Sequence, residues 1–380
     1  MEFKFTETQL MIKEMAKKFA QDVLAPSANE RDEKEEFPYE AVKQMGELGL
    51  LGMMVSEKYN GAGLDTVSYV LAMEEISKID AAAGVIMSVN NSLVCYGIQE
   101  WGSEYQKEKY LKQLATGKML GAFALSEPEA GSDASNQKTV AIKDGNHYVL
   151  NGTKNFITNG ANADVVLVMA ATDKSKGAHG ISAFIVEKGT QGFEVAKKEK
   201  KLGIRSSDTV SLSFTDCRVP EENRIGEEGF GFKFAMKTLD GGRIGIAAQA
   251  LGIAQAAFEA SLKYSKERKA FGQLIAEFQA IQFKLADMAT KIEAARLLTL
   301  KAAALKDANE PYGMASSMAK LYASKVAVDS ALEAIQIHGG YGYIKDYPVE
   351  RYLRDAKITE IYEGTSEVQR IVISRNILKT

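Results

Sequence analysis

The stretch FQAIQFKLADMATKIEAA, residues 278–295, carries apolar side chains at alternating intervals of three and four residues. The apolar series is Phe278, Ile281, Leu285, Met288, Ile292 and Ala295. This spacing puts one side chain per turn on a single helix face and is typical of the packed seam of a helix bundle. A similar face is formed by Leu251, Ala254, Ala257 and Phe258. Both faces could also pack across a subunit interface. We therefore predict a helical bundle over residues 231–380.

The preceding region has a different periodicity. In VSLSFT (210–215), apolar residues alternate with Ser and Thr, as in a half-buried strand. Asp144-Gly145 separates two short apolar runs and predicts a hairpin turn. The apolar runs 165–169 and 181–186 also have the length of strands. Residues 122–230 are therefore predicted to form a middle β domain.

The region before it, residues 1–121, has helical signals. Thr6 with Gln9, and Ser103 with Gln106, have the spacing of helix capping boxes. Helices, then strands, then helices argue for separate domains rather than an alternating βαβ sheet. The expected fold is mainly α with a middle β domain, divided into residues 1–121, 122–230 and 231–380.

The amino-acid composition argues against some classes of binding partner and cellular location. The net charge of -3 argues against a general nucleic-acid binder, which would be basic. Cys95 and Cys217 are the only cysteines, too few for a disulfide framework, and a reducing compartment fits them. The N-terminus lacks the apolar core of a signal peptide, and no apolar run approaches the ~18 residues of a membrane span. We expect a cytoplasmic protein without membrane insertion.

Several chemistries are disfavoured. No GxGxxG follows a strand, and neither a P-loop nor a GxSxG elbow is present. His147, His179 and His338 are the only histidines, and none is paired at the spacing of metal ligands. A catalytic triad is therefore not expected, and neither is a metal site.

Four segments combine polar groups with glycine. LSEPEAGSD (125–133) could cradle a pyrophosphate or hydrogen-bond a ring, but taken alone it is a weak signal that an ordinary loop explains. FITNG (156–160) could be a wall for a flat ligand or an edge strand. DGGR (240–243) could hydrogen-bond amides and phosphates or simply begin a helix. YEGTSE (362–367) contains a carboxylate that apolar surroundings would make a stronger base, but a helix end is the simpler local interpretation.

The order and spacing of these segments make the chain resemble the acyl-CoA dehydrogenase family, especially its short-chain, butyryl-CoA branch. The resemblance covers essentially the whole chain. Its most specific pieces are LSEPEAGSD (125–133), FITNG (156–160), LGIRSSDT (202–209), LDGGRIGIAAQALGIAQ (239–255), ERKAFGQ (267–273), QIHGGYGY (336–343) and RDAKITEIYEGTSEVQR (354–370). It implies an N-terminal helical domain, a middle β domain and a C-terminal four-helix bundle. It also implies a homotetramer, a dimer of dimers, with each FAD shared between two subunits.

The resemblance also implies roles for individual residues. Glu363 matches the catalytic base. The residues implied to bind FAD are Phe123, Leu125, Ser126, Gly131, Ser132, Phe156, Ile157, Thr158, Arg268, Phe271, Gln279, Gln336, Ile337, Gly339, Gly340, Thr365, Ser366 and Glu367. Those implied to contact the acyl-CoA are Ser132, Asp240, Gly241, Gly242, Arg243, Tyr362 and Gly364. The groups implied to stabilise the thioester oxygen are the backbone N–H of Glu363 and a ribityl hydroxyl of FAD.

The implied reaction is α,β-dehydrogenation of a short-chain acyl-CoA, with butyryl-CoA favoured, to a trans-2-enoyl-CoA. Electrons would pass to an electron-transferring flavoprotein. Some relatives place the base near position 242, but Gly242 stands there, so Glu363 has no evident rival. Glu129 and His338 depart from residues common in the family. The alternatives are a dehydrogenase for 2-methyl-branched short acyl groups, an acyl-CoA oxidase, and a non-catalytic protein that binds CoA thioesters.

Overall fold

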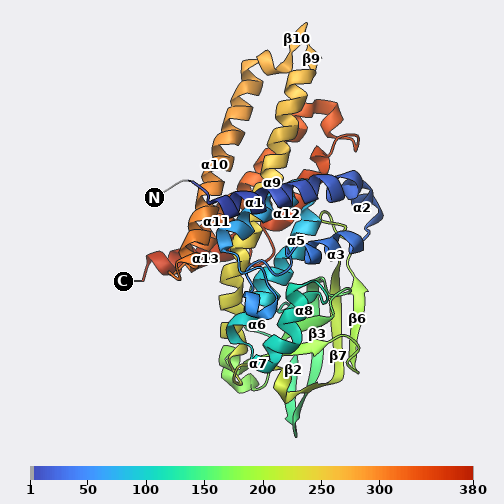
Figure 1. The fold of residues 1–380 in the computed structure, drawn as a ribbon, viewed down its shortest axis with the longest axis vertical. Helices are drawn as coiled ribbons and strands as arrows, with labels where there is room; N and C mark the ends of the chain where they lie inside the picture. The colour runs from blue at the N-terminus through green and yellow to red at the C-terminus, as the bar shows by residue number, and fades with distance from the viewer. Residues whose placement is uncertain (1–3, 380) are drawn as a thin grey trace.

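The computed structural model describes residues 4–379 as an elongated molecule with its β-sheet at one end (Figure 1). The helices of the first region begin across the middle of the molecule, and the last of them lie beside the sheet (Figure 1). They are α1 (Glu7–Phe19), α2 (Ala28–Lys34), α3 (Tyr39–Glu47), α4 (Thr66–Ile79), α5 (Ala81–Ser88), α6 (Tyr96–Trp101), α7 (Glu104–Gln106) and α8 (Lys112–Ala115). Both predicted capping boxes are confirmed, at Thr6 with Gln9 and at Ser103 with Gln106.

The middle region forms one sheet with mostly antiparallel neighbours. Its strands are β1 (Gly121–Ala124), β2 (Val140–Asp144), β3 (His147–Thr158), β4 (Val165–Ala171), β5 (Ile181–Glu187), β6 (Phe193–Lys198), β7 (Thr209–Pro220) and β8 (Arg224–Ile225). The order is β6-β7-β3-β2-β4-β5-β8, with β1 parallel to β4. The predicted hairpin at Asp144-Gly145 is confirmed, because Asp144 pairs with His147 across it.

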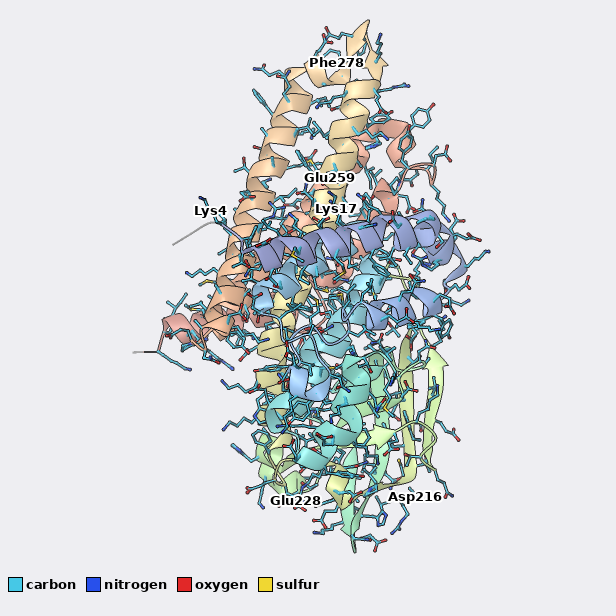
Figure 2. The ribbon with its side chains drawn as sticks, viewed as in Figure 1. Lys4, Lys17, Asp216, Glu228, Glu259 and Phe278 are labelled. Atoms are coloured by element: carbon cyan, nitrogen blue, oxygen red, sulfur yellow. The ribbon has the colours of Figure 1, made fainter. Side chains whose placement is uncertain are left out.

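The helices of the third region build the other end of the molecule, and the first of them also runs back to the sheet end (Figure 1). They are α9 (Gly231–Glu267), α10 (Gln279–Asp307), α11 (Gly313–His338), α12 (Val349–Thr359) and α13 (Ser366–Ile377). A two-stranded turn, β9 (Lys269–Ala270) with β10 (Gln273–Leu274), joins α9 to α10. Figure 2 places Phe278 at this tip and Asp216 and Glu228 at the opposite end.

The predicted bundle seam lies on α10. Its second half, Met288, Ile292 and Ala295, is buried, whereas Phe278, Ile281 and Leu285 near the tip are only partly buried. The bundle core is continuous with that of the N-terminal helices, so the two helical regions share one hydrophobic core.

Strand β4 shows how the sheet joins this helical core. Its side chains alternate between two cores, as the two-residue period of a strand requires. Val165, Leu167 and Met169 pack on the helices, whereas Val166, Val168 and Ala170 face a second core built mainly from strand residues. One face of the sheet is therefore packed on the helical core, including α9, the helix that carries residues 239–243.

One segment corrects the expectation that no apolar run approaches the length of a membrane span. The continuous helix Ala81–Trp101 is long and apolar enough by composition, but 94% of its 18-residue window is buried inside the protein. The side-chain amides of Asn90 and Asn91 donate to the carbonyls of Leu51 and Leu50, both at 2.8 Å. Burial on every side explains the apolar composition of this helix.

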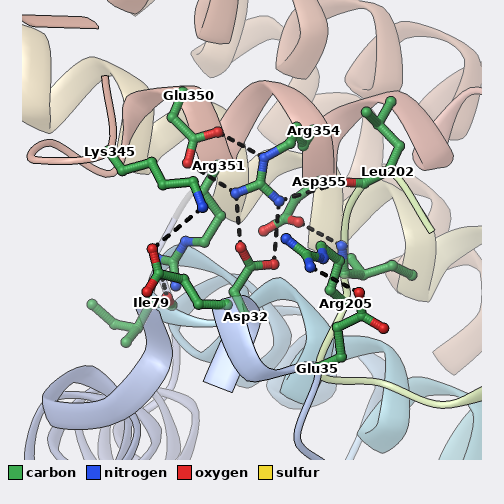
Figure 3. A network of polar contacts seen from close by, with 12 residues as sticks. Asp32, Glu35, Ile79, Leu202, Arg205, Lys345, Glu350, Arg351, Arg354 and Asp355 are labelled. Atoms are coloured by element: carbon green, nitrogen blue, oxygen red, sulfur yellow. Dashed lines mark hydrogen bonds and ion pairs between the residues drawn. The ribbon is translucent and has the colours of Figure 1, made fainter. Parts of the chain in front are cut away.

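A polar network fixes α12, the helix that leads to Glu363 (Figure 3). Arg354 bonds to Asp32 on α2 at 2.7 Å and to Glu350 at 2.7 Å. The N–H of Ile204, in the loop before β7, donates to Asp355 at 2.5 Å. Charge-assisted, two-pronged contacts of this kind restrict orientation as well as distance. The network therefore ties the N-terminal helices and the middle region to the helix that positions the candidate base.

Candidate active site

Glu363 lies in the short turn between α12 and α13. Its φ is 52° and that of Gly364 is 96°, so two successive residues adopt left-handed backbone conformations. Such a conformation costs a non-glycine residue roughly 1 kcal/mol and persists only where surrounding contacts enforce it. Glycine is required at 364, because an added Cβ would lie 2.7 Å from Nε2 of Gln369.

The Glu363 carboxylate is directed against α9 at Gly242. An added Cβ at Gly242 would lie 2.2 Å from Glu363 Oε2 and 2.8 Å from Leu93 Cδ2. Oε2 is buried and has no hydrogen-bond partner among residues 4–379. A buried oxygen of this kind is rare, because leaving it unpaired costs free energy. The glycine at 242 thus creates the space in which the carboxylate lies.

The electrostatic environment of this carboxylate suits a base. Burial raises the pKa of Glu363 to about 7, against the opposing charges of Lys320 and Arg243. A pKa near the working pH gives a base that is both ionised and basic enough to take a proton. Perturbed carboxyl groups of this kind concentrate at functional sites.

Asp240 and Arg243, two predicted substrate contacts, bond to each other. Arg243 donates to Asp240 at 2.7 Å and to Ser317 at 3.2 Å, and only 5% of it is exposed. Burial lowers the pKa of Arg243 and raises that of Asp240. Gly241 does not face the Glu363 carboxylate, and an added Cβ there would fit, because its nearest neighbouring atoms would be 3.8 Å away.

Beyond Gly242, the same face of α9 is filled by polar contacts. An added Cβ at Gly245 would lie 2.5 Å from the hydroxyls of Tyr69 and Ser88, which bond to each other at 3.0 Å. One turn further, Gln249 accepts from the Tyr362 hydroxyl and donates to the carbonyl of Ala81 at 2.7 Å. This closed wall limits the space beside the carboxylate.

Sequence reasoning missed Tyr69, Gln249 and Lys320. Lys320 is fully buried on α11 and donates to the Gly364 carbonyl at 2.5 Å. The sequence does contain a signal for Lys320: it is a lysine on a helix face otherwise made of small residues, four positions from both Ser316 and Ser324. No comparable signal marks Tyr69, whose role depends on contacts between separate helices.

The two segments predicted near the flavin ring lie side by side. The N–H of Asn155 donates to the carbonyl of Ser126 at 2.9 Å. Phe123 is 9% exposed and stacks on Phe234, and Leu125 is also buried. Gly131 and Ser132 are exposed in the following loop.

Residues 156–158 alternate in direction. Phe156 is 66% exposed and Thr158 is partly exposed. The Ile157 side chain lies in the strand core, so this residue can offer a ligand only its backbone. The sequence motif grouped the three together, but an irregularity in strand pairing between Lys154 and Ile157, where Phe156 has a φ of 60°, separates them.

A buried ion pair supports the loop after β1. Lys154 donates to Glu127 at 2.7 Å, to the Leu125 carbonyl at 3.1 Å and to Gln137 at 3.1 Å. Burial lowers the pKa of Lys154 to about 8. Burial opposes ionisation of Glu127, but Lys154 and nearby N–H donors outweigh it and hold the pKa of Glu127 below its usual value. The pair is charged at neutral pH.

Another group of predicted cofactor residues surrounds a separate hollow near the hairpin tip. The hollow has a volume of about 510 Å³ and is lined by Tyr264, Arg268, Ile275, Ile337, His338, Gly339, Gly340, Tyr341 and Ile344. An added Cβ at Gly339 or Gly340 would meet nothing within 4 Å. The His338 ring stacks on Tyr264, with ring centroids 4.2 Å apart.

The remaining predicted cofactor residues do not line that hollow. Phe271 is 97% exposed at the tip, and Gln279 and Gln336 are exposed. Thr365 caps α13, accepting from the N–H of Val368 at 3.3 Å, with Ser366 and Glu367 beside it.

The candidate base and the hollow are far apart within one chain. Gly242 and Glu267 are both in α9, and the rise of 1.5 Å per residue separates them by about 38 Å. A single dinucleotide cannot reach residues at both ends of that span.

Three consecutive parts of the chain match known domains. They are the N-terminal domain of acyl-CoA dehydrogenases over residues 6–118, the middle domain over 122–217 and the C-terminal domain over 229–378. The chain therefore belongs to the acyl-CoA dehydrogenase family of enzymes, with the fold expected from its sequence.

Individual relatives show which branch of the family the chain is similar to. The short-chain specific acyl-CoA dehydrogenase of Clostridium acetobutylicum is 54% identical over 100% of both chains. The structure of butyryl-CoA dehydrogenase from Megasphaera elsdenii is 51% identical over 100% of both chains, with a TM-score of 0.99. A chain from structural work on the electron transferring flavoprotein of Acidaminococcus fermentans is 55% identical over 100% of both chains, also with a TM-score of 0.99.

Proposed function

We propose that this enzyme removes two hydrogens from a short-chain acyl-CoA, with butyryl-CoA as the favoured substrate, to give a trans-2-enoyl-CoA. The observation that carries the proposal is the Oε2 atom of Glu363, which is buried without a hydrogen-bond partner among residues 4–379 and is directed against Gly242. An unpaired carboxylate of raised pKa suits removal of a proton from carbon, which offers no hydrogen bond in the ground state.

In this proposal Glu363 takes the α-proton of the thioester at its carboxylate. The backbone N–H of Glu363 has no acceptor among residues 4–379, so it is free to donate to the thioester oxygen, where negative charge develops. Tyr362, held by Gln249, closes one side of the site against water. Excluding water strengthens both the base and the hydrogen bond to the oxygen.

The residues fit FAD as the cofactor. The open cradle at Gly339 and Gly340 beside Arg268 suits a dinucleotide end, and the exposed ring of Phe156 with Thr158 suits a flat ring. Bound FAD would supply the acceptor for the hydride from the β-carbon. We propose an electron-transferring flavoprotein as the partner that takes the electrons, which the similarity to the Acidaminococcus fermentans chain supports.

The wall beside the base supports the proposed preference for short acyl groups. Gly245 leaves no room for a side chain next to Tyr69 and Ser88, and fully buried Gln249 is fixed at both ends. A long acyl chain would have to displace these hydrogen-bonded groups at a cost of about 1–3 kcal/mol for each buried polar group left unpaired. Similarity to the Clostridium and Megasphaera enzymes supports the same preference.

We also propose that the enzyme works as a homotetramer, built from dimers that share FAD. The span of about 38 Å between Gly242 and Glu267 supports this, since Arg268 of one chain would serve a flavin held by another. The limits 1–121, 122–230 and 231–380 remain our proposed domains. Cys95 and Cys217 are buried and unpaired, as expected for the reducing cytoplasm.

The test is anaerobic reduction of the purified yellow enzyme by straight-chain acyl-CoAs of increasing length and by a 2-methyl-branched acyl-CoA. The proposal predicts the fastest flavin reduction with a four-carbon acyl group and formation of the trans-2-enoyl product. A maximum at twelve or more carbons would contradict the short-chain assignment. Peroxide release that matches turnover in air would favour an oxidase, and a colourless protein without activity would favour a non-catalytic binder.

A further inference from the structure

Lys320 is a buried cation on α11 that reaches the turn carrying Glu363. Its residue is 0% exposed, and its Nζ donates to the carbonyl of Gly364 at 2.5 Å. That carbonyl is its only hydrogen-bond acceptor among residues 4–379, so no carboxylate is hydrogen-bonded to the ammonium group. Burying an ammonium in this way costs several kcal/mol, which a purely structural contact would not require.

The contact fixes an otherwise unfavourable backbone. Glu363 and Gly364 both have positive φ, and the Gly364 carbonyl accepts a second hydrogen bond, at 2.8 Å, from Nε2 of Gln369. The same amide nitrogen lies 3.4 Å from the Glu363 carbonyl. These donors hold the two carbonyls toward α11 and α13. They thereby fix the two peptide planes that follow the Glu363 Cα and restrain the direction of its side chain.

Lys320 also contributes charge to the site. The titratable groups around Glu363 are Arg243 on α9, Lys320 on α11, Tyr69 on α4 and Tyr362 in the turn itself. Arg243 is hydrogen-bonded to Asp240, so part of its charge is already balanced. Burial lowers the pKa of Lys320 to about 8, and the negative charge of Glu363 opposes this shift most strongly, with Arg243, Glu360 and Glu367 as the other charged groups that act on it.

We propose that Lys320 is a positioning residue for the base, which fixes the 363–364 turn through the Gly364 carbonyl and balances the negative charge of the buried carboxylate. A neutral donor could perform the first task but not the second. The proposal rests on the assignment of Glu363 as the base. It adds that the carboxylate depends on a cation 43 residues earlier in the chain.

The test compares the pH dependence of kcat/KM in flavin-loaded Lys320→Gln, Lys320→Met and Lys320→Arg, over the pH range in which the variants stay folded. Removing the positive charge should raise the pKa of Glu363, so the acid limb of the kcat/KM profile should move upward by about one pH unit in the Gln and Met variants. At pH 6 their kcat/KM should therefore fall about tenfold more than at pH 9. Lys320→Arg should keep the limb near its original position.

Lys325→Gln is the matched control, because it removes a lysine from the same helix at the surface, where Lys325 pairs with Asp329. Its acid limb should not move. In a Glu363→Gln background, Lys320→Gln should reduce the residual rate by less than about twofold, because residues acting through one group are not additive.

An unmoved acid limb in folded, flavin-containing Lys320→Gln would overturn the proposal. Failure of both neutral variants to fold would also overturn it, because the ammonium would then serve the fold. The assignment of the base has a separate test. If Glu363→Gln alone kept near-normal turnover, the proposed function would fail, whatever the Lys320 variants do.

Discussion

Gly242→Ala should inactivate the enzyme without unfolding it. The added Cβ would lie 2.2 Å from Oε2 of Glu363, whereas an ordinary contact is about 3.4 Å, so the carboxylate must move by about 1 Å. Leu93, 2.8 Å from the same Cβ, blocks an easy shift of the helix. A misplacement of about 1 Å can cost about 100-fold in rate, or about 2.7 kcal/mol of transition-state stabilisation.

The stability of the folded protein should change much less than its activity in Gly242→Ala. In a helix interior, alanine is favoured over glycine by about 1 kcal/mol, which offsets part of the cost of the contact with Glu363. The assay is kcat/KM with butyryl-CoA, together with the thermal midpoint and flavin content of the same sample. We expect about 100-fold lower kcat/KM, with flavin retained and a thermal midpoint within a few degrees of the original.

Gly241→Ala is the neighbouring comparison, since its Cβ would have nothing nearer than 3.8 Å. It should change KM rather than the rate of proton removal, and by less than about tenfold. A Gly242→Ala enzyme within threefold of the original kcat/KM would refute the assignment of this glycine as the space for the carboxylate.

Gln249→Ala should open the wall beside the base and shift the best acyl chain by about two carbons, measured across a chain-length series; an unchanged optimum would contradict this role. Lys154→Met should leave the buried Glu127 without its cation, lowering the free energy of unfolding by about 3–5 kcal/mol and promoting flavin loss. Adding Glu127→Leu removes the buried charge but leaves the N–H groups of Lys138 and Thr139 without their acceptor, so it should recover only part of that stability. Glu363→Gln should stabilise the folded protein above pH 7 by about 3 kcal/mol, because the folded pKa of about 7 lies above the usual 4.5 and ionisation therefore opposes folding. This gain should disappear as the pH falls from 7 to 4.5, and a gain independent of pH in thermal unfolding would refute it.

Local rules predicted much of the fold. The capping boxes at Thr6 and Ser103 and the turn at Asp144-Gly145 depend on residues a few positions apart, which is why sequence spacing identifies them. The shared core of the N-terminal and C-terminal helices has no such local signal. Helix 81–101 looks like a membrane span for the same reason, since composition cannot reveal which helices surround it.

The candidate active site likewise contains residues that sequence motifs identify and residues whose roles depend on contacts between distant segments. Glu363 and Gly242 were found through motifs, but their contact depends on two segments 121 residues apart in the chain. Lys320 matters because it meets the Gly364 carbonyl in the turn before α13, and it stands in none of the motifs found in the sequence. Gln249 stands in the motif 239–255, but that motif does not show that its side chain meets Ala81 on α5. Ile157 was grouped with its neighbours because a motif gives no direction to a side chain, whereas strand geometry does.

The most direct test of the central claim is the anaerobic, single-turnover reduction of flavin by butyryl-CoA in Glu363→Gln at pH 8. Glutamine keeps the size of the side chain and removes only its ability to accept a proton. Flavin content and CoA-thioester binding should be retained, while the rate of flavin reduction should fall by at least about 1000-fold, within the range of general-base catalysis. A rate within tenfold of the original enzyme would show that another group removes the α-proton.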